Sequence, residues 1–218
     1  FEGIAFDGTI DLTIYMRGNM IDGGVWKDDS FIYLNGEGSS LYVDGGDTHK
    51  PHNIRVGGGG VSIFYNFGAY DIPNYQGTHP SDAPATITYY GGTICNMKSN
   101  CDGSFLYINE DDVYVTFTNV NFVACCADGE GGLVYAANYD YVWVWFEHCI
   151  IDYCGTYRYG SDDGGVVYWN ADDSGRLTFK DCKISNCFSG DEGSAIYMNN
   201  GELVFDDVAI IENWSNRD

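Results

Sequence analysis

One alternation of glycine, apolar and tyrosine positions recurs four times in the second half of the chain. Each occurrence reads Gly-[Gly/Ser]-x-apolar-Tyr-apolar, and the four begin at Gly103, Gly131, Gly164 and Gly193. A phenylalanine follows each glycine at a similar distance, at Phe117, Phe146, Phe179 and Phe205. Both markers return after about 30 residues, which is typical of a solenoid that stacks similar units.

The repeating unit is rich in glycine, valine, tyrosine, phenylalanine, aspartate and asparagine, which are poor helix formers. Short alternating segments separated by turn residues indicate three strands in each unit. When such units stack, each strand pairs in parallel with its equivalent in the next unit, about 4.8 Å away. We therefore predict an all-β fold, a right-handed parallel β-helix of about six or seven coils with three short strands per coil.

Alternation within the strands separates core positions from surface positions. The third and fifth residues after each repeat glycine are apolar and are predicted to face the core, as at Leu106 and Ile108. The marker phenylalanines are predicted to form one interior stack. The outward positions are aromatic, and we predict an exposed contact surface made of Tyr107, Tyr135, Tyr168, Tyr197, Trp143 and Trp145. The alternative is that inserted loops fold over these rings and bury them.

The pattern weakens toward the N-terminus but survives in GSSLYV at residues 38–43. We interpret residues 1–218 as one β-helix domain, with irregular coils over residues 1–67 and regular coils over residues 91–218. Residues 68–90 hold three of the four prolines and are predicted to form a loop that projects from one corner.

Residues 103–213 resemble the β-helix repeats of the polymorphic outer-membrane-protein type. That family pairs a GGA[I/L/V] motif with an FxxN motif, and the similar segments here are GGLVY, GGVVY and GSAIY with FEHC, FKDC and FDDV. The resemblance implies a pectate-lyase-like fold and a protein of the kind found among surface adhesins and extracellular proteins. Because β-helices serve as lyases, adhesins and structural rods, the resemblance implies the fold rather than one function.

The charge of the chain narrows the choice of partners. Its 218 residues include 32 Asp and Glu against 10 Lys and Arg, a formal net charge of -22. Such a charge repels phosphate backbones and anionic lipid head groups, which argues against nucleic-acid partners and electrostatic membrane docking. No apolar run approaches the roughly 18 residues of a membrane span, so we expect no direct membrane insertion.

Eight cysteines, several at repeated spacing, favour a disulfide framework and an extracellular or cell-surface location. The candidates for disulfide formation are Cys95, Cys101, Cys125, Cys126, Cys149, Cys154, Cys182 and Cys187. Cys149 and Cys182 share one column of adjacent coils, so a disulfide between coils is the preferred interpretation there, as it is for Cys154 and Cys187.

Other cysteine pairings are less defined. Cys95 and Cys101 are predicted to close a local loop, while the partners of Cys125 and Cys126 stay open. The alternative is a ladder of reduced cysteines that fills the core. A sequon at Asn213 predicts N-glycosylation there, in agreement with an extracellular location.

No convergent catalytic set emerges from the sequence. Polysaccharide lyases and hydrolases need clustered carboxylates together with Arg or Lys, and basic residues are scarce here. Paired aspartates recur at predicted turns, where turn chemistry explains them. Asn170, Asp172 and Asp181 superficially match a calcium loop, although the glutamate expected at its twelfth position and the flanking helices are missing. We predict no catalytic residue, metal site or cofactor, with weak Ca²⁺ binding to the acidic surface as the alternative.

These features together predict a secreted or cell-surface structural or adhesive protein, a segment of a stalk or of a self-assembling filament. Its expected partners are copies of itself or other extracellular proteins, with glycans as the alternative. The competing hypothesis is a carbohydrate-active β-helix enzyme or a glycan-binding module.

Overall fold

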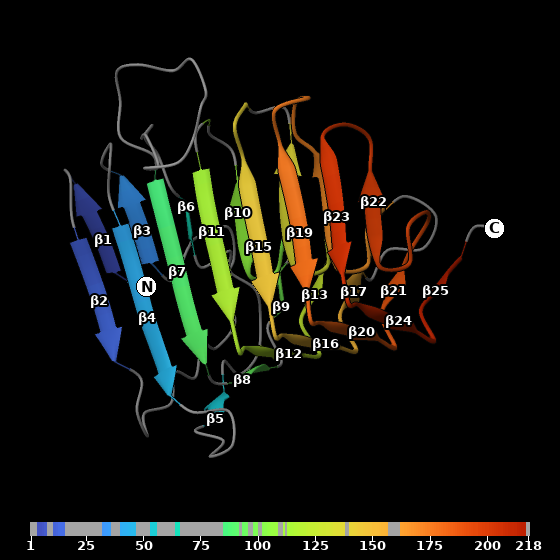
Figure 1. Ribbon diagram of the computed structural model, residues 1–218, viewed down its shortest axis with the longest axis horizontal. Helices are drawn as coiled ribbons and strands as arrows, with labels where there is room; N and C mark the ends of the chain where they lie inside the picture. The colour runs from blue at the N-terminus through green and yellow to red at the C-terminus, as the bar shows by residue number, and fades with distance from the viewer. Residues whose placement is uncertain are drawn as a thin grey trace.

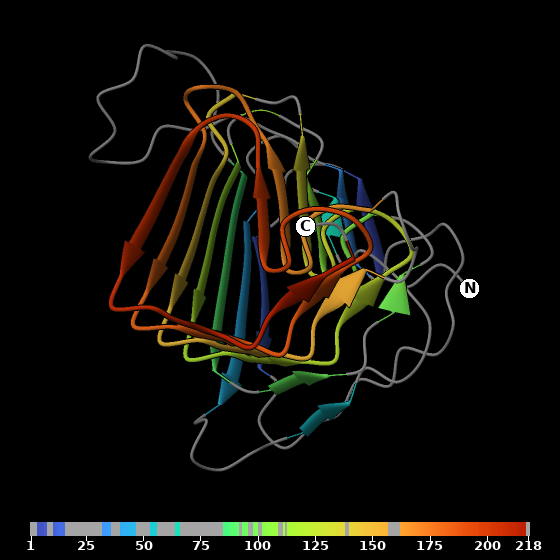
Figure 2. The same cartoon turned by 90° about the vertical axis from the view of Figure 1, so that its right-hand side faces the viewer.

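The computed structural model describes residues 4–7, 11–15, 32–35, 40–46, 53–55, 64–65, 85–91, 93–95, 98–99, 102–108, 111, 113–137, 140–156 and 162–216. Within these residues the chain is all-β and contains no helix, so none of them forms a helix long and apolar enough to span a bilayer. The strands lie side by side along the long axis of the molecule (Figure 1). Figure 2 shows the coils nested one behind another, with the C-terminal coil in front.

The strands form five sheets. The seven-stranded sheet contains β2 (Asp11–Tyr15), β4 (Ser40–Gly46), β7 (Ala85–Gly91), β11 (Val113–Thr118), β15 (Trp143–Glu147), β19 (Arg176–Lys180) and β23 (Glu202–Asp206). The four-stranded sheet contains β10 (Leu106–Ile108), β14 (Val134–Ala137), β18 (Val167–Asn170) and β22 (Ile196–Met198). The three-stranded sheet contains β1 (Ile4–Asp7), β3 (Ile32–Asn35) and β6 (Phe64–Tyr65).

The two remaining sheets consist of short strands. The six-stranded sheet contains β5 (Asn53–Arg55), β8 (Thr93–Cys95), β12 (Asn121–Val123), β16 (Ile150–Asp152), β20 (Lys183–Ser185) and β24 (Ala209–Ile211). The five-stranded sheet contains β9 (Lys98–Ser99), β13 (Cys126–Ala127), β17 (Gly155–Thr156), β21 (Phe188–Ser189) and β25 (Trp214–Ser215). Described strands pair in parallel with their equivalents in adjacent coils, as β11 does with β15. The parallel solenoid predicted from the repeat is therefore confirmed, with about four regular turns about 29 residues apart.

Three corners of each regular coil use a left-handed backbone conformation. The repeat glycines occupy one such corner, with φ between 61° at Gly103 and 70° at Gly164. The other two corners are taken by non-glycine residues, the first column being Asn119, His148, Asp181 and Asp207 and the second being Ala124, Tyr153, Asn186 and Glu212. The N–H of each described corner residue in the inner coils donates to a carbonyl of the next coil, as His148 does to Lys180 O at 3.0 Å. Pairing between coils therefore continues through the corners.

The aromatic stack predicted for the interior is present. Ring centroids of Phe117 and Phe146 lie 4.9 Å apart, and those of Phe146 and Phe179 lie 4.8 Å apart with planes only 4° from parallel. These three rings are fully buried. Phe205 continues the stack at 5.8 Å from Phe179 but is 45% exposed, because no described strand covers its other side. The expectation that all four rings are interior is thus wrong for the last one.

Two other expectations need correction. Each regular coil has four strands rather than three, because a two-residue strand such as β13 follows the third predicted strand. The alternation of apolar residues could not reveal it, since two residues are too few for a period. Strand β7 covers residues 85–91, so the last part of the loop predicted over residues 68–90 is strand. The rest of that loop lies outside the described residues.

Candidate functional site

A continuous row of stacked tyrosines runs along the four-stranded sheet. Its members are Tyr107, Tyr135, Tyr168 and Tyr197, which are register partners in β10, β14, β18 and β22. Successive ring centroids lie 4.8, 5.3 and 5.1 Å apart, with planes 16°, 10° and 9° from parallel. We call these four residues the tyrosine ladder. All four side chains are half-buried, and each inner ring has both faces covered by its neighbours, so the ladder offers ring edges and hydroxyl groups to a partner.

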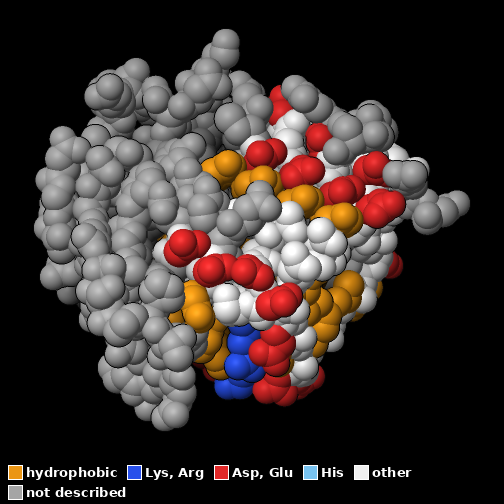
Figure 3. All heavy atoms as spheres, turned by 90° about the horizontal axis from the view of Figure 1, so that it is seen from above, with side chains coloured by type: hydrophobic (Ala, Val, Ile, Leu, Met, Phe, Trp, Pro, Cys, Tyr) orange, Lys and Arg blue, Asp and Glu red, His pale blue; other side chains and the backbone are white. Residues whose placement is uncertain are grey.

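A column of acidic residues accompanies the tyrosine ladder. It consists of the residues directly before the four repeat glycines, namely Asp102, Glu130, Asp163 and Glu192. We call these residues the acidic column. Figure 3 shows Asp and Glu side chains gathered in rows along the solenoid beside hydrophobic side chains. The column was not predicted from the sequence, although an acidic residue before every repeat glycine was the signal that could have revealed it.

Main-chain hydrogen bonds hold the acidic column in place. The Asp102 carboxylate accepts a hydrogen bond from Glu130 N at 2.8 Å, and the Asp163 carboxylate accepts one from Glu192 N at the same distance. The adjoining glycine N–H groups donate across the coils as well, for example Gly131 N to Asp163 O at 2.9 Å. The carboxylates of Asp102 and Asp163 therefore have a structural role that also fixes their positions.

The electrostatics of this face are dominated by negative charge. Burial, followed by the charges of Asp102, Asp163 and Asp162, raises the pKa of Glu130 to about 7. Burial and nearby carboxylates, Glu130 first among them, raise the pKa of Tyr168 to about 12. The pKa of Tyr135 is raised for the same reasons, with Asp102 as the largest charge effect. The phenols of Tyr135 and Tyr168 are therefore uncharged at neutral pH, and the neighbouring acidic side chains disfavour ionisation of Glu130.

The two tryptophans predicted to be exposed differ in the structure. Trp145 is 42% exposed on the outer face of β15. Trp143 is half-buried, because its ring packs edge-on against Tyr114 and its Nε1 donates to Ser174 O at 3.2 Å. Exposure of Trp143 was therefore overestimated, since alternation places a side chain outside a strand but does not show what lies next to it.

Polar side-chain contacts between coils, two of them ion pairs, lie on the seven-stranded sheet and at its edge. Lys180 Nζ donates to Glu147 Oε1 at 2.7 Å, and this hydrogen bond lowers the pKa of Glu147. Arg176 Nε lies 3.4 Å from Glu202 Oε2 in the last coil. His148 Nδ1 lies 3.5 Å from Asp181 Oδ2 at the corner that follows these strands.

The six cysteines whose side chains the structure describes do not form the predicted disulfides. Cys125, Cys126, Cys149, Cys154, Cys182 and Cys187 are free and buried. The side chain of Cys95 and all of Cys101 lie outside the described residues. Side chains of one column in a parallel ladder point the same way, so their Cβ atoms stay about 4.8 Å apart, farther than the ~3.8 Å typical of a disulfide. The structure thus agrees with the alternative of a reduced ladder in the core for five of these residues, all except Cys126, whose register partners are Lys98 and Gly155.

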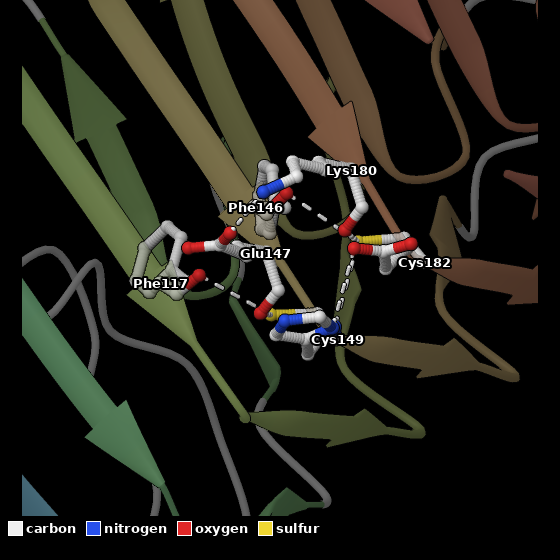
Figure 4. Close-up of polar contacts among 8 residues, drawn as sticks. Phe117, Phe146, Glu147, Cys149, Lys180 and Cys182 are labelled. Carbon is white, nitrogen blue, oxygen red and sulfur yellow. Dashed lines mark hydrogen bonds and ion pairs between the residues drawn. The ribbon is translucent and has the colours of Figure 1, made fainter. Parts of the chain in front are cut away.

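The buried thiols are held by main-chain carbonyls (Figure 4). Cys149 Sγ donates to Phe117 O of the preceding coil at 3.4 Å, and Cys182 Sγ donates to Phe146 O at the same distance. Cys182 Sγ also accepts a hydrogen bond from Cys149 N at 3.4 Å. Burial raises the pKa of the Cys149 and Cys154 thiols, so these groups stay protonated and unreactive in the folded chain.

The residues considered for calcium do not converge. Asp172 lies before β19 and Asp181 lies after it, so the strand separates them by roughly 16 Å at about 3.3 Å per residue. Asn170 accepts a hydrogen bond from Asn199 Nδ2 at 3.1 Å. The superficial match to a calcium loop therefore does not correspond to a calcium site. Among the described residues, no group of three or more His, Cys, Asp or Glu side chains is arranged to hold a metal ion.

Asn213, the predicted glycosylation site, continues a cysteine column at the C-terminal end. Its Oδ1 accepts a hydrogen bond from Cys187 N at 2.8 Å, and its Nδ2 donates to Ile184 O at 3.3 Å. Nδ2 is the atom to which a glycan is attached. Glycosylation would therefore leave Nδ2 a single N–H for the hydrogen bond that joins the last coil to the one before it.

The last coil leaves the apolar interior open at its end. Its inward positions continue buried columns of the preceding coils, as Ile210 continues Ile184, and yet they are exposed to solvent. We call this surface the C-terminal end face, and its large apolar residues are Leu203, Phe205 and Ile210. The outer edges of β22, β23, β24 and β25 have no described strand partner.

Comparison with known protein families, with curated proteins and with solved structures found no match for this chain. Its function must therefore be inferred from its own surfaces.

Proposed function

We propose that this chain is a structural or adhesive solenoid that acts outside the cell or at its surface, through contacts of its faces rather than through catalysis. One observation carries the proposal, the C-terminal end face, where core columns and strand edges stop without a described cover. Large exposed apolar surfaces of this kind mark interaction sites, and open strand edges invite the pairing of another chain.

Two occupants fit the C-terminal end face, a further coil of a longer stalk and a second copy of the chain. The strands β2 and β23 are the two edge strands of one parallel sheet, so β2 of a second copy can pair with β23 in the direction used throughout that sheet. The edges of the six-stranded sheet, β5 and β24, are related in the same way. Such head-to-tail contacts do not close on themselves, and repetition produces a filament or stalk.

The finer description of the fold is part of this proposal. We infer a right-handed β-helix of about six or seven coils, akin to repeats of the polymorphic outer-membrane-protein type. The strands β2, β4 and β5, which extend the sheets of the regular coils toward the N-terminus, support a coil number above four. Extracellular location rests on the repeat resemblance and the sequon, because the free cysteines remove the support expected from disulfides.

The test compares two adjacent isoleucines of β24 that are exposed to nearly the same extent. Ile210, 47% exposed, continues the interior column, whereas Ile211, 44% exposed, alternates to the outer side of the strand. Light scattering and electron micrographs should show assemblies that grow with concentration for the native chain and Ile211→Lys, and a single small species for Ile210→Lys. A net charge of -22 on each copy opposes association, so added salt should strengthen it.

A monomeric native chain at all concentrations and salt levels would remove the support for self-association. Catalysis is checked separately by incubating the chain with acidic and neutral polysaccharides, with and without Ca²⁺. Turnover that a single Asp→Asn substitution abolishes would replace the structural function with the enzymatic one.

A further inference from the structure

The outer face of the four-stranded sheet combines two rows that run along the solenoid axis. The tyrosine ladder provides one row, with ring centroids about one coil apart, and the acidic column provides the other. Because both rows repeat with the coils, the face presents a periodic pattern of hydroxyl groups and carboxylates. This face is distinct from the C-terminal end face and does not depend on end-to-end association.

The face is fixed in advance of any binding event. Each repeat glycine adopts a positive φ that an L-residue rarely takes. The N–H groups of the first three donate to the next coil, as Gly164 N does to Glu192 O at 3.0 Å. The hydrogen bonds from Glu130 N to Asp102 and from Glu192 N to Asp163 orient two of the carboxylates. A partner that binds here meets side chains that have already lost most of their conformational freedom, which favours affinity.

The negative charge of this face indicates a positively charged partner. Every charged group that shifts the pKa of Glu130 is acidic, namely Asp102, Asp163 and Asp162. The cations Lys180 and Arg176 are engaged with Glu147 and Glu202 on the seven-stranded sheet. A bound cationic group would relieve the repulsion that these carboxylates exert on Glu130.

The geometry of the ladder distinguishes between kinds of partner. A sugar stacks on the face of an aromatic ring, but the faces of Tyr135 and Tyr168 are covered by neighbouring tyrosines. The ring edges and hydroxyl oxygens remain, and the latter accept hydrogen bonds from ammonium or guanidinium groups. The face therefore suits amine or guanidine side chains better than neutral glycans.

The spacing of the coils suggests how such side chains are arranged. Coils repeat every ~4.8 Å, so every second coil is about 9.6 Å away. An extended polyproline-type chain advances about 9.3 Å in its three-residue turn. A lysine or arginine at every third position of such a chain would therefore meet a carboxylate of every second coil.

We propose that the tyrosine ladder and the acidic column form a docking face for an extended lysine- or arginine-rich polypeptide that lies along the solenoid axis. The carboxylates bind the cationic groups, and the tyrosine hydroxyls accept further hydrogen bonds from them. The partner is thus a basic segment of another protein, held by a repeated charge pattern rather than by one deep pocket.

The test uses a fluorescent peptide of five Lys-Pro-Pro repeats with blocked ends, and anisotropy as the readout. The double variant Glu130→Gln with Asp163→Asn should weaken binding at least tenfold at low salt. The control, Asp206→Asn with Asp207→Asn, removes two carboxylates from the exposed end of β23 and the corner that follows it, and should change binding less than twofold. Equal losses in the two double variants would overturn the proposal, because they would reveal attraction to net charge alone.

The affinities of single variants and their dependence on pH test whether the peptide binds to this face. Tyr168→Phe, which removes one hydroxyl without disturbing the ring stack, should weaken binding about threefold. Binding should also be severalfold tighter at pH 8 than at pH 6, because a cation favours the ionised form of Glu130, and Glu130→Gln should reduce that difference. If the double variant fails to fold by circular dichroism, these two single variants decide the matter. An unchanged affinity in both would overturn the proposal, as would binding of Ca²⁺ or cellohexaose at this face without binding of the peptide.

The two proposals fail independently. Peptide binding is measured on Ile210→Lys as well as on the native chain, so it does not require assembly. Salt should weaken peptide binding and strengthen end-to-end association, so opposite salt dependences identify which interaction is being observed.

Discussion

The inner coils and the last coil carry the same residue pattern in different surroundings. Phe146 and Phe205 occupy one column and both pack against Phe179, but Phe146 is fully buried whereas Phe205 is 45% exposed. In a solenoid each unit is stabilised mainly by its two neighbours. The contrast teaches that burial here is a property of the position in the stack and not of the sequence of the unit.

The largest effect on stability is expected for a substitution in the core, and it tests this contrast directly. Phe146→Ala should destabilise the chain by about 3–5 kcal/mol, because it leaves a cavity between two stacked rings. Phe205→Ala should cost only about 1–2 kcal/mol, because much of that ring already meets solvent. Chemical denaturation of both variants gives the comparison. Equal losses would mean that the end of the stack is covered in solution.

A second contrast concerns the residue after each repeat glycine, which is glycine in the coils that begin at Gly131 and Gly164 and serine in those that begin at Gly103 and Gly193. A Cβ at Gly165 would lie 2.5 Å from Phe188 O, so Gly165→Ala should cost about 1–3 kcal/mol through forced backbone shifts. Ser194 already carries a Cβ, and Ser194→Ala should change stability by less than about 0.5 kcal/mol. Thermal unfolding of the pair measures this. A neutral Gly165→Ala would show that the inner coils are packed less closely than the structure indicates.

A third contrast is the pH dependence of the acidic column. The pKa of Glu130, raised to about 7, lies above its unfolded value, so the folded chain binds the extra proton. Its contribution to stability is fully present below the unfolded pKa and is lost as the pH rises through about 7. Glu130→Gln should raise the melting temperature by a few degrees at pH 8 and have little effect at pH 4. Equal gains at both pH values would contradict this.

The smallest effect is expected at the ion pairs. Glu147→Gln removes the hydrogen bond with Lys180 between two inner coils, and Glu202→Gln removes the contact with Arg176 at the last coil. Both changes should be slight, because exposed pairs contribute little. The pKa of Glu147 is lowered, so its contribution is present above its unfolded pKa and disappears as the pH falls through its folded pKa. Denaturation at pH 7 and pH 3 should reveal a difference for Glu147→Gln only at the higher pH.

Sequence reasoning predicted the parts of the fold that repeat with a long enough period. The glycine and phenylalanine markers gave the parallel stacking, and the alternation around Leu106 and Ile108 identified core positions. The two-residue strands were missed because a strand such as β17 has no alternation to detect.

The contact surfaces were predictable only in part. Tyr135 and its equivalents were placed on the outer face, but the acidic column was not noticed because it mixes Asp with Glu. The alignment of the cysteines in columns was predicted correctly, but the disulfides between them were wrong. The repeat shows which cysteines lie in adjacent coils, but not whether their Cβ atoms come close enough for a disulfide. Exposure of Trp143 depended on Ser174 and Tyr114, which belong to other coils.

The left-handed corners have a consequence for how such a chain can change. The stretch between β17 and Gly164 is longer than the corresponding stretches after β13 and β21, yet β18 remains in register with β14 and β22. Extra residues can therefore enter at this corner without shifting the rungs on either side. A loop that recognises a new partner could therefore be inserted at this corner. The sequence of such a loop could change while the stacked coils stay the same.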